Sequence, residues 1–355
     1  MSEVILVTGA AGYIGSHFIE AFIEDDFWLA RAPRLVFLDD LSTGHLEFIH
    51  RLTLLAKERG LPVPVFESVS LLDSVALDRV LDQHRPTAVL HYAARISVAE
   101  SVANPALYLS NNVEGSCNLL SSMKKSGTRN LIFSSTAAVY GAVADPKLRD
   151  LPLPESTPLG PINPYGETKL QMEEEIRKAA LDWGLNSVIF RYFNAAGASL
   201  RGRLGEWHEP ETHLIPLMLR ALLSGKPLSV FGTDYPTRDG SCVRDYIHVS
   251  DLASAHRMGL LRLLSNAVQG SEVYNLGTAS GTSVLEVIKA AEKVTGKKVA
   301  YEVFPRRPGD SGVLIADATR ARTVLGWVPN SSSVEAIIQT ALQWEQGGLK
   351  SMNHP

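Results

Sequence analysis

Cysteine is scarce in this chain, and what the sequence lacks excludes several classes of protein. Its two thiols, Cys117 and Cys242, are too few for a disulfide framework and lie far from any cluster with metal-ligand spacing. No apolar run approaches the ~20 residues that span a bilayer, and the amino terminus lacks a signal segment. A formal net charge of −4 gives no general attraction to nucleic acid or an anionic membrane. We therefore expect a cytoplasmic protein whose partners include neither nucleic acid nor a membrane.

Short apolar runs rich in β-branched residues alternate with longer helical segments in the first half of the chain. The runs lie at 4–9, 34–40, 62–68, 88–94, 130–136 and 187–193. Nearly continuous apolar strands with crossover helices between them are typical of a parallel sheet that is covered on both faces. The predicted fold class is therefore α/β, with a doubly wound parallel sheet of the Rossmann kind.

The rhythm changes after Asn194, where a polar loop, an apolar helical stretch and several short strands follow. We predict a dinucleotide-binding Rossmann domain over 1–190 and a second, smaller mixed α/β substrate domain over 191–355. The chain is expected to cross back to the sheet near 243–276. The stretch LEFIHRLTLLAKERG, between Gly44 and Pro64, predicts an added surface helix.

Three glycines follow the first predicted strand in the stretch TGAAGYIGSH. Gly9, Gly12 and Gly15 are spaced G-x-x-G-x-x-G at the start of a helix. Glycine permits a tight turn and the close approach of a pyrophosphate, whose charge then lies at the helix amino terminus. Asp39 ends the second strand, where a carboxylate accepts hydrogen bonds from ribose hydroxyls and repels a 2′-phosphate. The pattern favours NAD over NADP, and a plain structural turn with a solvated Asp39 is the alternative.

A tyrosine and a lysine stand four residues apart in YGETK, after the proline-rich PLGPINP. On a helix, Tyr165 and Lys169 share a face. An ammonium and a positive nicotinamide ring favour the phenolate, lowering a tyrosine pKa from about 10 by roughly 1–3 units. Thr136 ends the fifth predicted strand, and ligands gather at the carboxyl ends of parallel strands. These three residues are predicted to handle a proton at a substrate oxygen, although such a pair also occurs by chance on exposed helices.

With further motifs along nearly the whole chain, these residues resemble the extended short-chain dehydrogenase/reductase superfamily and, within it, the UDP-glucose 4-epimerases. The motifs that carry the resemblance are VTGAAGYIGSH, YAARISVAES, NNVEGS, FSSTAAVYG, YGETK, RYFNAAGA, VRDYIHV, YNLGT and RRPGD. The resemblance implies reversible epimerisation of UDP-galactose and UDP-glucose at sugar C4, through a transient 4-keto sugar and with tightly bound NAD.

The resemblance also implies a catalytic role for each of the three residues. Tyr165 takes the proton of the 4-hydroxyl, Lys169 contacts the nicotinamide ribose and tunes Tyr165, and Thr136 orients the hydroxyl. Hydride passes from C4 to NAD and returns to the other face of the keto sugar after that sugar has turned in place. We expect the UDP to be held firmly and the sugar loosely.

Further cofactor-binding positions follow from the same resemblance. Besides the glycines, Asp39, Tyr165 and Lys169, they are Tyr13, Ile14, Val69, Ser70, Ala93, Asn111, Ser134 and Tyr192. Two of the positions depart from the family pattern. Val69 stands where an acid commonly holds the adenine amino group, so its contact must be apolar or through the backbone. Ile96, with Arg95 beside it, stands where some members carry a lysine.

Substrate-binding positions are implied mainly in the second half of the chain. They are Ser135 and Thr136, then Asn194, His213, Leu214, Arg244, Arg307, Asp310 and Leu314. Arg244 and Arg307 match the two diphosphate-binding arginines, since a guanidinium fork suits paired phosphates. Asp310 matches the uridine-ribose acid. Leu314 stands where some members carry a tyrosine, which leaves room for a 2-acetamido sugar.

Several alternatives stay open at this point. A different UDP-sugar, namely a UDP-N-acetylhexosamine, UDP-glucuronate or a UDP-pentose, is one of them. A nucleotide-sugar dehydratase or decarboxylase is disfavoured because Ala137 and Ala138 replace its usual carboxylates, and a non-catalytic NAD-binding regulator need not keep Tyr165 with Lys169. No metal site is predicted, because Pro210 and a five-residue histidine spacing break the WHEPETH pattern. A homodimer through helices around 100–124 and 165–182 is implied by resemblance.

Overall fold

The computed structural model describes residues 3–141, 151–307 and 311–348. The chain divides into two compact units, neither of them a single continuous segment. Unit 1 consists of residues 1–139, 163–191 and 253–274, and unit 2 consists of residues 140–162, 192–252 and 275–355.

Unit 1 is built on a seven-stranded sheet. In order across the sheet the strands are β3 (Val65–Glu67), β2 (Arg34–Leu38), β1 (Val4–Thr8), β4 (Ala88–His91), β5 (Asn130–Thr136), β6 (Asn186–Tyr192) and β11 (Ser271–Leu276). The pairings of β1 with β2 and β4, of β2 with β3 and of β4 with β5 are parallel. The order 3-2-1-4-5-6 is that of the doubly wound dinucleotide-binding fold, so the predicted fold class is confirmed.

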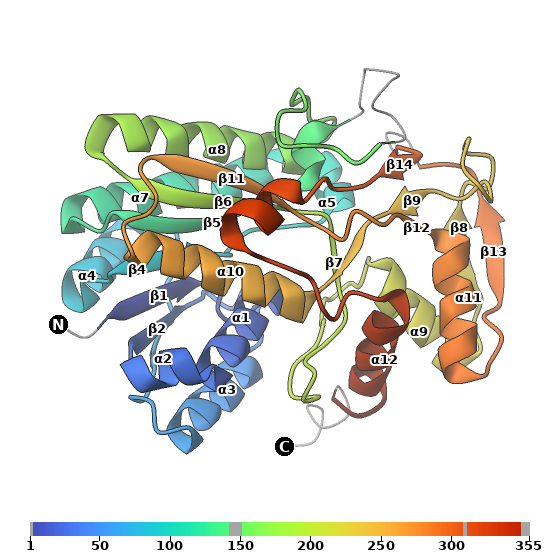
Figure 1. Cartoon of the computed structure of the whole chain (residues 1–355), viewed down its shortest axis with the longest axis horizontal. Coiled ribbons are helices and arrows are strands. Elements are labelled where there is room, and N and C mark those ends of the chain that lie inside the picture. Colours follow the sequence, from blue (N-terminus) through green and yellow to red (C-terminus); the bar gives the residue numbers. More distant parts are fainter. Residues whose placement is uncertain (1–2, 142–150, 308–310, 349–355) are drawn as a thin grey trace. The chain divides into compact units, whose positions relative to one another are not determined.

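Helices lie on both faces of this sheet (Figure 1). Those of unit 1 are α1 (Tyr13–Glu24), α2 (Asp26–Arg31), α3 (Leu46–Glu58), α4 (Ser74–His84), α5 (Val98–Ala103), α6 (Pro105–Tyr108), η1 (Leu109–Glu114), α7 (Gly115–Ser126), α8 (Pro164–Trp183) and most of α10 (Val249–Leu264). Apolar residues of α4, α7 and α8 join sheet residues in one core. On the other face, the rings form an aromatic cluster. His256 of α10 contacts both Phe18 of α1 and Phe190 of β6. Burial on both faces explains the nearly continuous apolar strands.

The helix that the sequence predicts between Gly44 and Pro64 is present as α3. One stripe of it, formed by Phe48, Ile49, Leu52 and Leu55, is buried, whereas Leu54 between them is exposed. An apolar stripe at this spacing is what a surface helix needs in order to pack on a domain.

Unit 2 is made of small sheets and helices. Its strands pair as β7 (Asn194–Ala196) with β10 (Tyr246–His248), β8 (Leu228–Phe231) with β13 (Tyr301–Phe304), and β9 (Val243–Arg244) between β12 (Thr282–Ser283) and β14 (Val313–Leu314). The helices are α9 (Leu214–Ser224), α11 (Val284–Thr295) and α12 (Val334–Gln343), with the short turns η3 (Ala321–Leu325) and η4 (Trp344–Gly348), and η2 (Ala137–Tyr140) leads in from β5. Apolar side chains of α9, α11 and α12 form the core of this unit.

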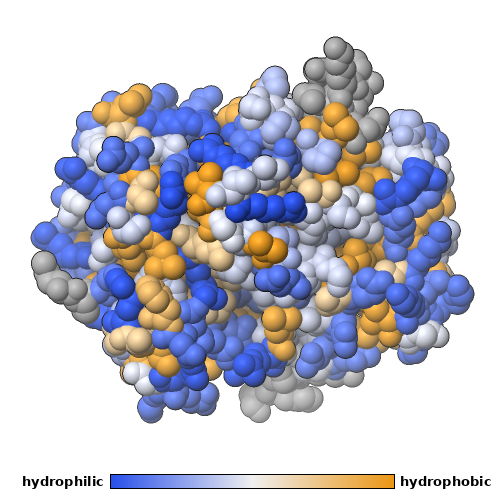
Figure 2. Space-filling model, in the orientation of Figure 1, coloured by the Kyte–Doolittle hydropathy of each residue, from blue (hydrophilic) through white to orange (hydrophobic). Residues whose placement is uncertain are grey.

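The surface is mixed in character. On the face shown in Figure 2, hydrophilic and hydrophobic residues are interspersed. Among the residues that the structure describes, no helix combines the length and the apolar character that crossing a membrane requires.

A histidine is buried in the middle of unit 1, at the end of β4. Its Nδ1 lies 2.7 Å from the hydroxyl of Thr8 in β1, and its Nε2 lies 2.8 Å from the hydroxyl of Ser116 in α7. Burial, with the nearby Lys169 charge, lowers the pKa of His91 to about 3. The neutral imidazole therefore links the sheet to a helix.

This histidine makes stability depend on pH. Unfolded His91 takes up a proton near pH 6.5 and the folded side chain does not, so stability present above that pH is lost as the pH falls toward 3. Between pH 7.5 and 5.5, we expect wild-type unfolding free energy to fall by about 1.4 kcal/mol more than that of His91→Gln. Urea titration at both pH values checks this, and the exposed control His50→Gln should follow the wild type. Equal losses in wild type and His91→Gln would contradict the prediction.

Candidate active site

The glycine turn after β1 is closed by backbone contacts that leave no space for side chains. Gly9 has a φ of +68°, and a Cβ there would lie 2.5 Å from the backbone nitrogen of Ala93. A Cβ on Gly15 would lie 2.2 Å from the carbonyl oxygen of Gly9. The N–H of Gly12, the N-cap of α1, donates to that same oxygen at 3.1 Å. The turn thus brings the start of α1 and the predicted cofactor residue Ala93 together, as a close approach to pyrophosphate requires.

Asp39 is fastened to this turn. Its carboxylate accepts the backbone N–H of Ala11 at 2.9 Å through Oδ2 and that of Leu41 at 2.9 Å through Oδ1. Burial raises the pKa of Asp39, an effect that these two hydrogen bonds oppose. A backbone cradle beside a buried acid at the end of β2 fits a dinucleotide with free ribose hydroxyls.

The remaining cofactor positions of unit 1 lie in varied surroundings. Tyr13 is buried at the start of α1, while Ile14 is partly exposed. Val69 is partly buried against the sheet core, and the Ser70 hydroxyl accepts the N–H of Leu72 at 3.3 Å. Asn111 is partly exposed in η1. Each of these assignments stays a prediction.

The neighbouring Asn112 is a structural residue that the sequence did not reveal. It is buried, and its side chain accepts the N–H of Arg95 at 2.8 Å and donates to the carbonyl of Arg95 at 3.0 Å. It also donates to the Thr168 hydroxyl of α8 at 3.2 Å. Asn112 therefore holds the loop after β4, in which Ile96 is 41% exposed, against the helix that carries Tyr165.

Helix α8 begins immediately before the predicted proton-handling pair. Asn163 caps it by accepting the N–H of Gly166 at 2.8 Å, and Pro164 occupies its first turn. Tyr165 and Lys169 follow one helical turn apart. The Lys169 Nζ is buried, donates to the carbonyl oxygen of Ser134 at 2.8 Å and lies 5.0 Å from the centroid of the Phe133 ring. The end of β5 and the start of α8 thus form one site.

The electrostatics of this site differ from the prediction. Burial raises the pKa of Tyr165 to about 12, opposed by a hydrogen bond with Thr136. Burial also lowers the pKa of Lys169 to about 7. The sequence predicted that the ammonium would lower the phenol pKa, and for the chain alone this is wrong, because the lysine is itself desolvated. The predicted meeting of Thr136 with Tyr165 is present.

A buried ion-pair network anchors α8 to the strands β5 and β6. Glu173 accepts hydrogen bonds from Arg191 of β6 at 2.9 and 2.7 Å, and from Arg177 at 2.7 Å. The Ser135 hydroxyl of β5 donates to the same carboxylate at 2.6 Å. The buried Ser135 hydroxyl therefore belongs to this network, and its predicted contact with substrate stays a prediction. The sequence signal for Glu173 is its position four residues after Lys169 on the same helix face.

The predicted substrate residues of unit 2 lie on several elements. Asn194 begins β7, and its N–H donates to the carbonyl of Asp245 at 2.9 Å. Arg244 of β9 is in register with Leu314 of β14, and its guanidinium donates to the carbonyls of Val243 at 3.0 Å and Ser311 at 2.9 Å. Strand pairing therefore brings Arg244 and Leu314, two of the predicted substrate residues, together.

The other predicted residues of the second half of the chain lie on separate elements. The guanidinium of Arg307 is exposed and lies 4.0 Å from the centroid of the Phe231 ring. Leu214 begins α9 and packs on the core of unit 2. Tyr192, the predicted cofactor contact, is buried at the end of β6. Asp310 lies outside the described residues.

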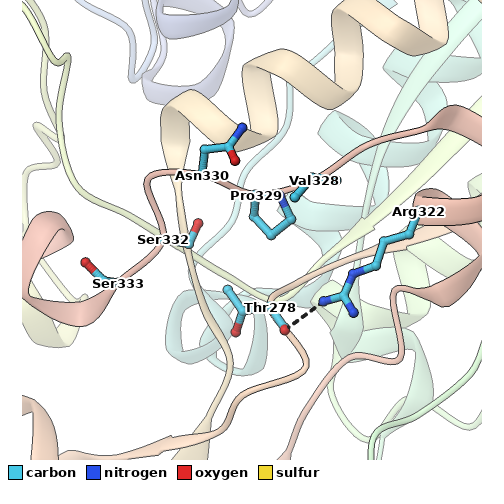
Figure 3. Close-up of a pocket in the computed structure, with 7 residues that line it drawn as sticks. All are labelled: Thr278, Arg322, Val328, Pro329, Asn330, Ser332 and Ser333. Carbon is cyan, nitrogen blue, oxygen red and sulfur yellow. Dashed lines mark hydrogen bonds between the residues drawn. The ribbon is translucent and has the colours of Figure 1, made fainter.

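A pocket of about 310 Å³ lies elsewhere in unit 2. It is lined by Thr278, Arg322, Val328, Pro329, Asn330, Ser332 and Ser333, and Arg322 donates to the carbonyl of Thr278 at 3.0 Å (Figure 3). None of these seven residues is a predicted site residue, so the pocket adds nothing to the assignment.

The WHEPETH segment forms a cluster that the sequence did not predict. The structure joins His208 and His213 to Glu206 and Glu211. Glu209, the remaining carboxylate of WHEPETH, is not in this set and accepts the indole N–H of Trp207 at 2.9 Å. The spacing rule for a helical metal motif could not find this set, because its members lie on a loop before α9.

Comparisons with known proteins agree with the fold. The UDP-glucose 4-epimerase of Lactobacillus helveticus is 42% identical over 347 residues, which is 98% of each chain. The UDP-glucose 4-epimerase of Brucella ovis, solved with NAD, is 39% identical with a TM-score of 0.85, covering 96% of this chain and 97% of that one. The enzyme from Bifidobacterium longum, solved with NAD⁺ and UDP, is 36% identical with a TM-score of 0.86, covering 97% and 98%.

The family model agrees as well. Residues 5–277 match the model described as the NAD dependent epimerase/dehydratase family. This span begins in β1 and includes the glycine turn, Asp39, Thr136, Tyr165 and Lys169. The match covers most of the chain, and the chain accordingly belongs to the NAD dependent epimerase/dehydratase family.

Proposed function

We propose that this protein interconverts UDP-galactose and UDP-glucose by inverting the sugar at C4, with tightly bound NAD. The observation that carries the proposal is the hydrogen bond between Thr136 and Tyr165 with Lys169 one turn along, all in the unit that holds the glycine turn. Relatives of the same length that are named UDP-glucose 4-epimerases support the choice of reaction.

Three side chains of this chain handle the proton. Bound NAD supplies the reversible hydride acceptor for the sugar C4. Tyr165 removes the proton from the 4-hydroxyl as the carbonyl forms and returns it when the alcohol is restored. Thr136, hydrogen-bonded to the phenol, orients that hydroxyl. No net oxidation results, so the protein consumes no second substrate.

The pKa values explain why the phenol works only in the assembled site. With burial raising the pKa of Tyr165 to about 12, the protein alone holds the phenol protonated. A positive charge brought within ~4–6 Å favours the phenolate by roughly 1–3 units. Lys169, whose pKa burial lowers to about 7, favours the phenolate only while its own amine is protonated, so a second positive charge from the cofactor strengthens the effect.

Unit 2 is proposed to hold the UDP. Asn194 and the two arginines Arg244 and Arg307 are assigned to the diphosphate, because guanidinium donors match paired phosphate oxygens. Asp310 is assigned to the uridine ribose. The register of Leu314 beside Arg244 supports a location of Leu314 near the substrate. His213 and Leu214 are assigned to the nucleotide through their backbone.

Competing functions lack the side chains they need. Ala137 and Ala138 follow Thr136, so the carboxylate of a dehydratase or decarboxylase is missing there. Cytoplasmic location and a homodimer stay predictions. On the helices around 100–124 and 165–182, the apolar residues Leu119, Leu120 and Met172 belong to the core of unit 1 and so give the homodimer no support.

Removal of the phenolic oxygen tests the proposed base. Tyr165→Phe should lower kcat for conversion of UDP-galactose at least ~10²-fold, the contribution typical of general acid–base catalysis, while NAD content stays near one per chain. Turnover is measured as UDP-glucose formed without added NAD, and cofactor is measured after release by denaturation. The exposed control Tyr301→Phe should match the wild type. Wild-type turnover by Tyr165→Phe would reject the assignment.

The size of the residue at 314 tests the sugar range. We expect the wild type to epimerise UDP-N-acetylgalactosamine as well as UDP-galactose, because leucine leaves more room than tyrosine. Leu314→Tyr should lower kcat/KM at least ~10-fold for the 2-acetamido sugar relative to UDP-galactose, about 1.4 kcal/mol. Both rates come from product analysis by chromatography. Complete rejection of the acetamido sugar by the wild type would disprove this part.

A further inference from the structure

Four potential metal ligands converge in the loop that leads into α9. They are the carboxylates of Glu206 and Glu211 and the imidazoles of His208 and His213, whose ligand atoms all lie within 4.8 Å of one another. Both histidines direct Nδ1 into the cluster, and their ring centroids are 5.3 Å apart. The proposed epimerisation uses none of these four side chains.

The spacing of the ligand atoms matches a tetrahedral metal site. The Nδ1 of His208 lies 3.4 Å from Oε1 of Glu206 and 3.8 Å from Oε1 of Glu211. The Nδ1 of His213 lies 3.7 Å from that same Glu211 oxygen and directly against Glu206. Zinc bonds of about 2.1 Å put tetrahedral ligand atoms about 3.4 Å apart. Three of these separations, 3.4, 3.7 and 3.8 Å, are longer than a normal hydrogen bond and close to the tetrahedral spacing.

The two carboxylates are buried and held in place by other contacts, which favours a metal site. The side chains of Glu206 and Glu211 are 5% and 2% exposed, and burying two carboxylates is costly unless opposite charge is present. Oε1 of Glu211 accepts the backbone N–H groups of Thr212 at 2.8 Å and His213 at 2.9 Å. Its Oε2 is buried without a hydrogen bond, with the Arg220 guanidinium 3.8 Å away. The Glu206 backbone carbonyl accepts the Trp344 indole N–H at 3.0 Å.

We propose that Glu206, His208, Glu211 and His213 bind one divalent transition cation, Zn²⁺ foremost. Two carboxylates neutralise its charge, and imidazole nitrogens select zinc over magnesium. Four protein ligands leave no open position, so the role is structural. The cation joins the two ends of the loop immediately before α9, whose N-cap is His213. The partly exposed side chain of His213 offers an entry path.

Protons compete with a metal ion for the ligand atoms of this site. Burial opposes charge on His208, but its attraction to the carboxylates of Glu206 and Glu211 raises the pKa of His208 to about 9. Burial likewise opposes charge on Glu206, yet the two histidines lower its pKa to about 2. The imidazolium of His208 therefore also neutralises the carboxylates, and zinc must displace protons from the imidazoles on binding. Proton release consequently separates a metal site from a plain ion-pair network.

The test is calorimetric titration of the untagged full-length protein with ZnCl₂ at pH 7.5, after treatment with a chelator. Two buffers of different ionisation enthalpy report the protons released. We expect one zinc per chain with a Kd below 1 μM, about −8.2 kcal/mol, and release of between one and two protons. Glu206→Gln and His208→Ala should each weaken binding at least 100-fold, and the exposed control His50→Ala should bind as the wild type does.

A second measurement covers variants that fold poorly. Co²⁺ added to the wild type should give the intense visible absorption of tetrahedral coordination, and ZnCl₂ should abolish it. Binding of less than one zinc per chain, release of no protons, or the same affinity in both variants and the control would overturn the site. The titration contains no sugar nucleotide, and loss of the epimerase proposal would leave its result unchanged.

Discussion

The position of the proposed catalytic residues depends on the buried carboxylate of Glu173. Through Arg191 and Ser135, that carboxylate ties α8 to β6 and β5, and so fixes the rotation and depth of the helix. Lys169 lies one turn before it, and a shift of α8 would move Lys169 from the carbonyl at the end of β5. Removing one partner of a buried ion pair typically costs about 3–5 kcal/mol, because the other charge is left uncompensated. Catalytic geometry and domain stability thus share one network.

Desolvation governs the chemistry of the site. The same burial raises the pKa of Tyr165 and lowers that of Lys169, so both side chains resist charge when no ligand is present. In surroundings of low polarity, one additional positive charge has a large effect on both. The protein therefore couples proton transfer to occupancy of the dinucleotide site. The phenol of Tyr165 thus stays protonated until the positive charge of the cofactor is nearby.

Much of unit 1 could be predicted from sequence, because strand periodicity and glycine spacing are local signals. The strands, the added helix and the closure of the turn at Gly9 all follow from short stretches of chain. Glu173 and Asn112 escaped prediction because their partners are 18 and 17 residues away on other elements. The prediction for the Tyr165 pKa weighed charge without burial, and burial raises that pKa for the chain alone. The hydrogen bond of Ser135 to Glu173 also escaped prediction, because three consecutive hydroxyl residues do not reveal which of them meets the network.

The division of the chain also limits how such a protein can change. The backbone passes between the units at 139–140, 162–163, 191–192, 252–253 and 274–275, and helix α10 itself contains one of these passages. Neither unit corresponds to a gene fragment that recombination could exchange intact. A deletion of residues 253–274 would therefore remove most of α10 and of β11 from unit 1, although this segment lies between two segments of unit 2. The cofactor site and the substrate site are therefore inherited together.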